Sequence, residues 1–193
     1  MYYKCMKRPV LIIIPGLGDR GWLYRIVVPV WYMLGFDAKV FIFGWNSQGP
    51  SHKVRMKRLL AYIDTTVEPV YVIGVSAGGV AAVNALYSRP HKIRQLVTVA
   101  TPYKVVPSLK NPILTALQKE VGIHMKHDPV LIAVHTTSFY GLYDRKVPTG
   151  KSQIAGVREV QLPIIGHGAI ILCTLTLYCM RVKKLLQGRT NVL

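Results

Sequence analysis

The feature that most constrains the fold of this chain is an apolar run that ends in a turn of small residues. Residues Val70–Val75 are β-branched or aromatic apart from Gly74, and an Ala- and Val-rich helical pattern begins just after Ser76. The sequence Gly-Val-Ser-Ala-Gly therefore lies between a buried strand and a helix, and Gly74 and Gly78 leave room for a sharp turn. Such a turn exposes Ser76 Oγ as a nucleophile and leaves the next amides, at a helix N-terminus, free to donate to an oxyanion. Because small residues also occur in ordinary strand-to-helix turns, the motif needs partners elsewhere in the chain.

Strands and helices alternate over the whole length. The 193 residues suffice for one sheet covered on both faces, so we predict a single domain over residues 1–193. The alternation predicts a mostly parallel, doubly wound sheet with right-handed crossovers. The predicted strands are Val10–Ile14, Ala38–Trp45, Val70–Val75, Gln95–Ala100, His135–Tyr140 and Glu159–Leu162, and the predicted helices are Trp22–Leu34, Val54–Ile63, Gly78–Tyr87, Pro112–Val121 and Ala169–Leu186, with a less regular segment over Asp128–Val134.

The first predicted strand is followed by a glycine-rich loop, Pro15-Gly16-Leu17-Gly18-Asp19. In open parallel sheets ligands bind outside the carboxyl ends of the strands, so the backbone of this loop lies where chemistry is expected. A plain turn is the alternative interpretation.

A serine nucleophile requires a histidine base and a carboxylate that orients it. In an α/β fold with this kind of turn, the acid and the histidine follow the serine, in loops after late strands. His167 lies between Gly166 and Gly168, after the last predicted strand and before the terminal helix. Asp144 follows the end of a strand, where a loop acid is expected, although turns favour Asp in any case. The other carboxylates after Ser76 are Glu120, Asp128 and Glu159, and the other histidines are His91, His124, His127 and His135.

Four motifs in this order resemble those of the α/β-hydrolase superfamily, nearest to its small lipases and esterases. They are Pro15-Gly16-Leu17-Gly18, Gly74-Val75-Ser76-Ala77-Gly78-Gly79, Tyr140 to Pro148 around Asp144, and Gly166-His167-Gly168. The resemblance implies that Ser76 is the nucleophile, His167 the base and Asp144 the orienting acid. It also implies an oxyanion hole formed by the amides of Leu17 and Ala77, with Gly16, Gly74 and Gly78 supporting the loop and the turn.

The resemblance implies a serine hydrolase that cleaves a carboxylic ester or thioester through an acyl-enzyme, without cofactor or metal. Amidase and acyltransferase activities stay open, because one fold hosts many chemistries. Pro15 and Val75 stand where many members have histidine, which leaves the substrate class undefined. The short segment between Ala100 and Asp144 excludes a large cap domain and allows at most a small flap at 103–127. A non-catalytic basic module that binds anionic lipid or polymer is the competing interpretation.

The chain is strongly basic. Its 25 Lys and Arg against 8 Asp and Glu give a formal charge of +17, which indicates attraction to anionic lipid headgroups, cell-wall polymers or nucleic acid. A uniformly basic, solvated surface is the alternative, since only Lys53–Arg58 and Arg181–Lys184 form clusters. We predict no specific nucleic-acid partner. The partners that fit are a small-molecule or lipid-like acyl ester as substrate and an anionic membrane surface that the protein contacts peripherally.

Compartment signals are few. The cysteines Cys5, Cys173 and Cys179 are odd in number and lack metal-ligand spacing, so they predict neither a disulfide framework nor a zinc site and favour the reducing cytoplasm. The apolar run Val10–Ile14 is too short for a signal peptide. The apolar stretch Ala169–Met180 is shorter than the roughly 20 residues that span a bilayer.

Overall fold

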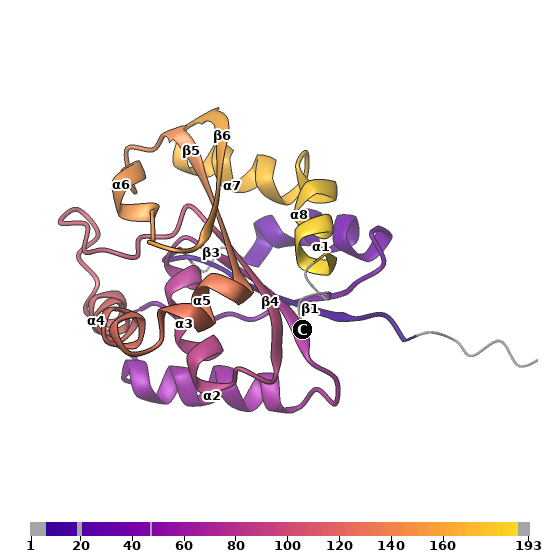
Figure 1. Ribbon diagram of the computed structural model, residues 1–193, viewed down its shortest axis with the longest axis horizontal. Coiled ribbons are helices and arrows are strands. Elements are labelled where there is room, and N and C mark those ends of the chain that lie inside the picture. The colour runs from indigo at the N-terminus through magenta and orange to yellow at the C-terminus, as the bar shows by residue number, and fades with distance from the viewer. Residues whose placement is uncertain (1–6, 19–20, 47, 189–193) are drawn as a thin grey trace, which may run out of the picture.

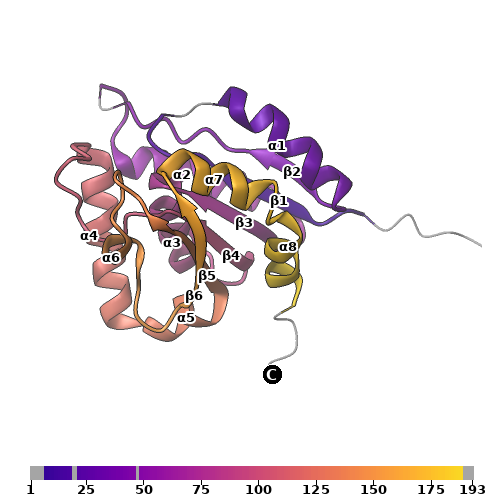
Figure 2. The ribbon, with the colours of Figure 1, turned by 90° about the horizontal axis from the view of Figure 1, so that it is seen from above.

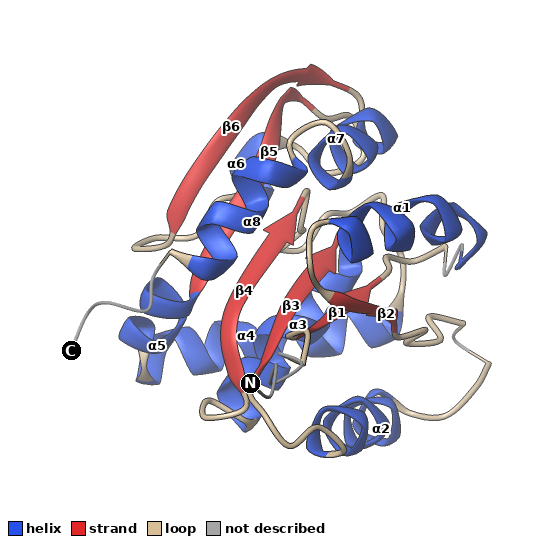
Figure 3. Cartoon of the chain, turned by 90° about the vertical axis from the view of Figure 1, so that its right-hand side faces the viewer, coloured by secondary structure: helices blue, strands red, loops and turns tan. Residues whose placement is uncertain are grey.

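The computed structural model describes residues 7–18, 21–46 and 48–188, so Cys5 and Asp19 lie outside the described residues. Six parallel strands form one sheet in the order β2-β1-β3-β4-β5-β6 (Figures 1 and 3). The predicted parallel α/β architecture is therefore confirmed. The strands are β1 (Val10–Ile14), β2 (Asp37–Val40), β3 (Val70–Val75), β4 (Ile93–Val99), β5 (Thr136–Tyr143) and β6 (Arg158–Ile165).

Helices cover both faces of this sheet (Figure 2). Alternate residues of β1 enter opposite layers, because successive side chains of a strand point to opposite faces. Leu11 and Ile13 pack in one buried cluster, whereas Ile12 and Ile14 pack in the other. The helices α1 (Gly21–Met33), α7 (His167–Leu175) and α8 (Cys179–Gln187) cover the first face, and α2 (His52–Asp64), α3 (Ala77–Ser88), α4 (Pro112–His127) and α5 (Pro129–His135) cover the second, with the short α6 (Thr149–Ser152) after β5.

The second strand is shorter than predicted. The sequence predicts a strand over Ala38–Trp45, but β2 ends at Val40. Phe41, Phe43 and Trp45 are still buried. The alternating apolar pattern therefore correctly indicates which side chains are buried, although most of this segment does not pair as a strand. The Phe41 amide still donates to the Ile13 carbonyl oxygen at 2.9 Å, but β1 ends at Ile14, just before Pro15, so it offers no strand for residues beyond Phe41 to pair with.

Two arginines of α2 hold the segment that follows β2. Arg55 is 4% exposed and donates from Nε to the Pro50 carbonyl oxygen and from Nη2 to that of Asn46, both at 2.6 Å. Arg58 Nη2 donates to the carbonyl oxygens of Ile42 and Phe43, at 2.6 and 2.9 Å. Arg58 therefore satisfies carbonyl groups within the predicted strand, and Arg55 satisfies two in the loop that follows it.

The predicted terminal helix Ala169–Leu186 is wrong as a single element. It is interrupted at residues 176–178 and forms α7 and α8. Thr176 has non-helical φ and ψ of −120° and −68°, and its hydroxyl donates to the Leu172 carbonyl oxygen at 2.7 Å. A threonine hydroxyl that competes for a backbone carbonyl weakens a helix interior. The break lets α8 bury Val182 and Leu186 against the sheet.

Within residues 7–18, 21–46 and 48–188 the structure has no large cap domain, as predicted. Of the segment 103–127, for which the sequence predicts at most a small flap, residues 112–127 form α4, while Leu109 in the loop before it lines the cavity described below. The helix α4 buries Leu114 and Leu117 against α3 and runs to His127, six residues past its predicted end at Val121. Both β5 and β6 are also longer than predicted, and beyond Phe139 the strand β5 pairs with β6 and no longer with β4. This extension carries residues 140–143 to the site described below.

Within the described residues, no helix is both long and apolar enough to cross a membrane.

The close contact between α3 and the end of β1 gives a stability prediction. A Cβ at Gly78 would overlap the carbonyl oxygen of Ile14 and lie 2.5 Å from that of Pro15, whereas a Cβ at Gly122 in α4 would meet nothing within 4 Å. Gly122→Ala should raise the free energy of unfolding by about 0.5–1 kcal/mol, the usual gain in a helix interior. Gly78→Ala should lower it by about 1–3 kcal/mol, because backbone must move. Urea unfolding measures both, and a stabilising Gly78→Ala would contradict the packing.

Candidate active site

Ser76 lies in a strained turn between β3 and α3. Its φ of 51° and ψ of −125° fall in a region that residues with a side chain rarely adopt, at a typical cost of about 1–3 kcal/mol. The Ser76 amide donates to the carbonyl oxygen of Val99 at 2.8 Å, and its own carbonyl accepts from the Gly79 amide at 2.9 Å. These bonds to β4 and to the first turn of α3 hold the conformation in place.

Glycines allow the backbone to close around this turn. A Cβ at Gly74 would lie 2.5 Å from Gly79 Cα and 2.9 Å from Ala82 Cβ. A Cβ at Gly16 would lie 2.8 Å from Ser76 Cβ and 3.2 Å from Ser76 Oγ. The loop after β1 therefore packs directly against the serine, which only a residue without a side chain permits.

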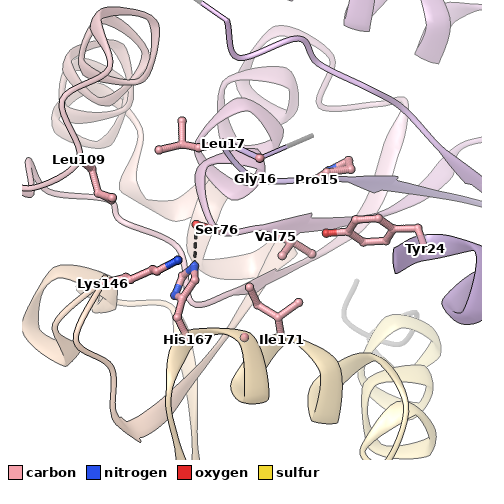
Figure 4. A pocket seen from close by; sticks show the side chains of 12 residues that line it. Pro15, Gly16, Leu17, Tyr24, Val75, Ser76, Leu109, Lys146, His167 and Ile171 are labelled. Atoms are coloured by element: carbon pink, nitrogen blue, oxygen red, sulfur yellow. Dashed lines mark hydrogen bonds between the residues drawn. The ribbon is translucent and has the colours of Figure 1, made fainter. Parts of the chain in front are cut away.

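The structure brings Ser76, His167 and Asp144 into one hydrogen-bonded line. His167 Nε2 lies 3.0 Å from Ser76 Oγ (Figure 4). On the other side of the ring, His167 Nδ1 lies 2.7 Å from Asp144 Oδ2. Asp144 follows β5 and His167 begins α7 after β6, so segments after three different strands supply the three side chains. A carboxylate only accepts hydrogen bonds, so Nδ1 carries the proton, and Nε2 is left to accept from the serine hydroxyl.

Asp144 is held as an anion. Only 5% of the residue is exposed, and burial by itself raises the pKa of its carboxyl group. The hydrogen bonds from His167 and from the amides of Val147 and Lys146 outweigh burial and bring the pKa below its ordinary value. The two amides donate to Asp144 Oδ1 at 3.0 and 2.9 Å, while Oδ2 faces the imidazole.

The other three carboxylates that follow Ser76 in the sequence have different partners. Asp128 Oδ1 accepts from the Leu131 amide at the start of α5. Glu120 lies 3.1 Å from His52 Nε2, between α4 and α2. Glu159 accepts from the Ile154 amide and from Tyr140. None of these three has a hydrogen bond to His167 among the described residues.

The loop predicted to supply an oxyanion donor is fixed by Trp45. The indole Nε1 donates to the carbonyl oxygen of Pro15 at 3.1 Å, and the carbonyl of Trp45 accepts from Asn111 Nδ2 at 2.8 Å. Leu17 lines the cavity beside Ser76, and Ala77 is the buried first residue of α3. The amides of Leu17 and Ala77 therefore belong to the two backbone segments that flank the serine, which is where an oxyanion hole is needed.

A cavity of about 260 Å³ opens beside Ser76 and His167. Its wall is mostly apolar, with Lys146 the one permanently charged side chain among the described residues that line it. Figure 4 shows Tyr24 and Ile171 on one side of the serine and Leu109 and Lys146 on the other. Sequence analysis missed these four residues, because they come from α1, α7 and two loops whose contacts no local pattern reveals.

Within the described residues, no group of three or more His, Cys, Asp or Glu side chains is placed to hold a metal ion.

Comparison with known proteins identifies the fold. No protein-family model and no curated protein matches the sequence. Solved structures do match: a monoacylglycerol lipase from Paleococcus ferrophilus has a TM-score of 0.68 at 13% identity, with 95% of this chain and 96% of that chain covered. Est1E from Butyrivibrio proteoclasticus has a TM-score of 0.69 at 16% identity (95% and 88% covered), and a thioesterase domain from the curacin biosynthetic pathway has 0.61 at 14% (94% and 92%). The chain has the α/β-hydrolase fold, as the sequence motifs predict.

The Trp45 contact leads to a kinetic prediction. Trp45→Phe keeps an aromatic ring beside Phe43 but removes the donor to the Pro15 carbonyl oxygen. If that bond positions the oxyanion loop, kcat on a small ester should fall about 10-fold or more while KM changes little. The reason is that a displaced loop would stabilise the transition state less and would hardly affect binding of the substrate. A rise in KM at constant kcat would instead mean that Trp45 serves substrate binding.

The lowered pKa of Asp144 leads to a prediction about stability and pH. A carboxyl group whose pKa is lower in the folded than in the unfolded state stabilises the fold above the unfolded pKa, about 3.9 for Asp, and loses this contribution as the pH falls through the folded pKa. The free energy of unfolding of the wild type should therefore fall more steeply below about pH 4 than that of Asp144→Asn. Parallel urea-unfolding curves for the two proteins would contradict this.

Proposed function

We propose that this protein is a serine hydrolase that cleaves carboxylic esters through an acyl-enzyme on Ser76. The observation that carries the proposal is the line Asp144–His167–Ser76, which ends at a strained turn and at an apolar cavity. A non-catalytic module has no need for a buried carboxylate, an oriented imidazole and a strained serine at one point. The monoacylglycerol lipase and the thioesterase domain among the structural neighbours support hydrolase chemistry.

In the acylation step, Ser76 Oγ attacks the ester carbonyl carbon as its proton passes to His167 Nε2. Asp144 accepts from Nδ1–H and stabilises the imidazolium that forms, without taking the proton itself. The negative charge on the carbonyl oxygen of the tetrahedral intermediate is stabilised by the amides of Leu17 and Ala77, the second at the N-terminus of α3. His167 then returns the proton to the departing alkoxide, and the acyl group stays on Ser76.

Deacylation repeats these steps with water. His167 Nε2 takes a proton from the water as its oxygen attacks the acyl carbon, and the same proton then restores the Ser76 hydroxyl as the carboxylic acid leaves. An alcohol or amine in place of water would give acyl transfer, so water access to the cavity decides between hydrolase and transferase. A thioester fits the same steps with a thiolate as leaving group.

The wall of the cavity favours an apolar acyl group. Leu17, Tyr24, Val75 and Ile171 line the space beside the serine. The cavity of about 260 Å³ limits the length of acyl chain that fits inside. In a series of linear esters, kcat/KM should rise about fourfold or less for each added methylene, which matches about 0.8 kcal/mol of burial, and level off once the cavity is full. A decline from acetate onward would contradict an acyl site here.

Replacement of the serine tests the nucleophile. Ser76→Ala should fold normally and lower kcat/KM for a p-nitrophenyl ester by roughly four to six orders of magnitude, because triad members act as a unit. The control is Ser88→Ala at the far end of the same helix, where the hydroxyl only donates to the Asn84 carbonyl oxygen. Ser88→Ala should keep full activity. Equal activity of Ser76→Ala and wild type would assign the nucleophile elsewhere.

A further inference from the structure

The first helix is apolar on almost every side. Of its thirteen residues only Arg25 is charged. Tyr24, Val27 and Trp31 face the sheet and are buried. On the opposite side, Trp22 and Ile26 are 61% and 60% exposed, and Met33 is 78% exposed. A helix that is apolar all round is normally covered on all sides, so the outer face of α1 has the composition of a contact surface.

The adjacent helices extend this surface. Trp31 Nε1 of α1 donates to the Leu175 carbonyl oxygen of α7 at 3.1 Å, and α1, α7 and α8 share one buried cluster, so the three helices form one layer (Figure 3). Leu172, Leu177 and Met180 are exposed along α7, the turn at 176–178 and α8. We name this surface the outer helical face, defined by Trp22, Ile26, Met33, Leu172, Leu177 and Met180.

The charges of this layer all have one sign. The helices α1, α7 and α8 contain no Asp or Glu, and they carry four permanent cations, Arg25, Arg181, Lys183 and Lys184. The opposite layer is mixed, with Asp64 in α2 and Glu120 in α4. The basic character predicted from the sequence is therefore combined with large exposed apolar side chains in a layer free of acidic residues.

We propose that the outer helical face docks on an anionic lipid surface. Trp, Ile, Leu and Met side chains enter the boundary between headgroups and acyl chains, while Arg and Lys extend to the phosphates, as in amphipathic helices that lie in a membrane plane. The Lys53–Arg58 cluster does not share this role, because α2 covers the other face of the sheet and Arg55 and Arg58 are bonded to backbone carbonyls.

Docking on this face would also place the cavity near the lipid. Tyr24 of α1 and Ile171 of α7 both line the cavity beside Ser76, so its wall is built in part from the two helices that would lie on the membrane. This consequence rests on the proposed function: the esters cleaved would be ones held in, or partitioned into, the lipid surface. The docking itself does not need catalysis.

Charge reversal on opposite layers tests the face. Using Ser76→Ala protein, so that no lipid is consumed, we compare binding to phosphatidylcholine vesicles with and without phosphatidylglycerol. Arg181→Glu/Lys184→Glu should weaken binding to the anionic vesicles at least 10-fold, and Lys53→Glu/Lys57→Glu, which makes the same charge change on α2, less than twofold. Binding of the parent should also fall steeply between about 0.1 and 1 M salt. Equal losses in both variants, or no preference for anionic vesicles, would overturn the proposal.

Tryptophan fluorescence provides an independent test. Trp22 is exposed, whereas Trp31 and Trp45 are 0% and 1% exposed, so a change of environment on docking is reported mainly by Trp22. Anionic vesicles should shift the emission to the blue, and brominated lipid should quench it. Trp22→Phe should remove the shift. Vesicle binding without a Trp22 signal would mean that another surface docks.

A second copy of the chain is the competing occupant of the face. Sedimentation equilibrium without lipid should give a monomer. A dimer that Trp22→Ser/Ile26→Ser dissociates, with vesicle binding unchanged, would overturn lipid docking. The result is distinct from failure of the proposed function, because fluorophosphonate labelling of Ser76 in wild-type protein needs neither lipid nor this face.

Discussion

The site depends on a backbone conformation that the chain would not adopt by itself. Ser76 is held at positive φ by hydrogen bonds to β4 and α3, and the strain is tolerated because the surrounding structure leaves no alternative. Gly16, Gly74 and Gly78 let three backbone segments approach within contact distance of the turn. The same packing that holds the serine in its conformation therefore also brings the β1 loop to its side.

The parallel sheet brings the residues of this site together from distant parts of the chain. In a parallel sheet all carboxyl ends lie at one edge, so the loops after β1, β3, β5 and β6 meet although they are far apart in sequence. Asp144 and His167 directly follow the extended ends of β5 and β6, which continue past the point where β5 stops pairing with β4. The reach of these two strands sets how closely the imidazole approaches Ser76.

Much of this arrangement is predictable from sequence, and the remainder has physical reasons. The Gly-x-Ser-x-Gly turn, the Gly-flanked His167 and the loop Asp144 have local signatures, so their positions follow from residue type and order. The early end of β2 does not, because Phe41–Trp45 alternate like a strand, while the carbonyl oxygens of Ile42 and Phe43 accept from Arg58 and that of Trp45 accepts from Asn111. The role of Trp45 is equally hidden, since it depends on a contact across 30 residues.

The two helical layers differ in a way that composition alone does not show. A charge of +17 describes the whole chain, but in the structure some cations support a loop and others border an apolar, acid-free layer. In the sequence, Lys53–Arg58 and Arg181–Lys184 look equivalent, since both are short basic clusters. The structure places them on opposite faces of the sheet, so no single planar surface can contact both.

The central claim is that Ser76 is an activated nucleophile. The most direct measurement is reaction with a fluorophosphonate probe followed by mass spectrometry of the labelled peptide. The account predicts one adduct, on Ser76, whose rate of formation falls sharply in His167→Ala and which is absent from Ser76→Ala. A wild-type protein that never reacts, or an adduct on another residue, would contradict it.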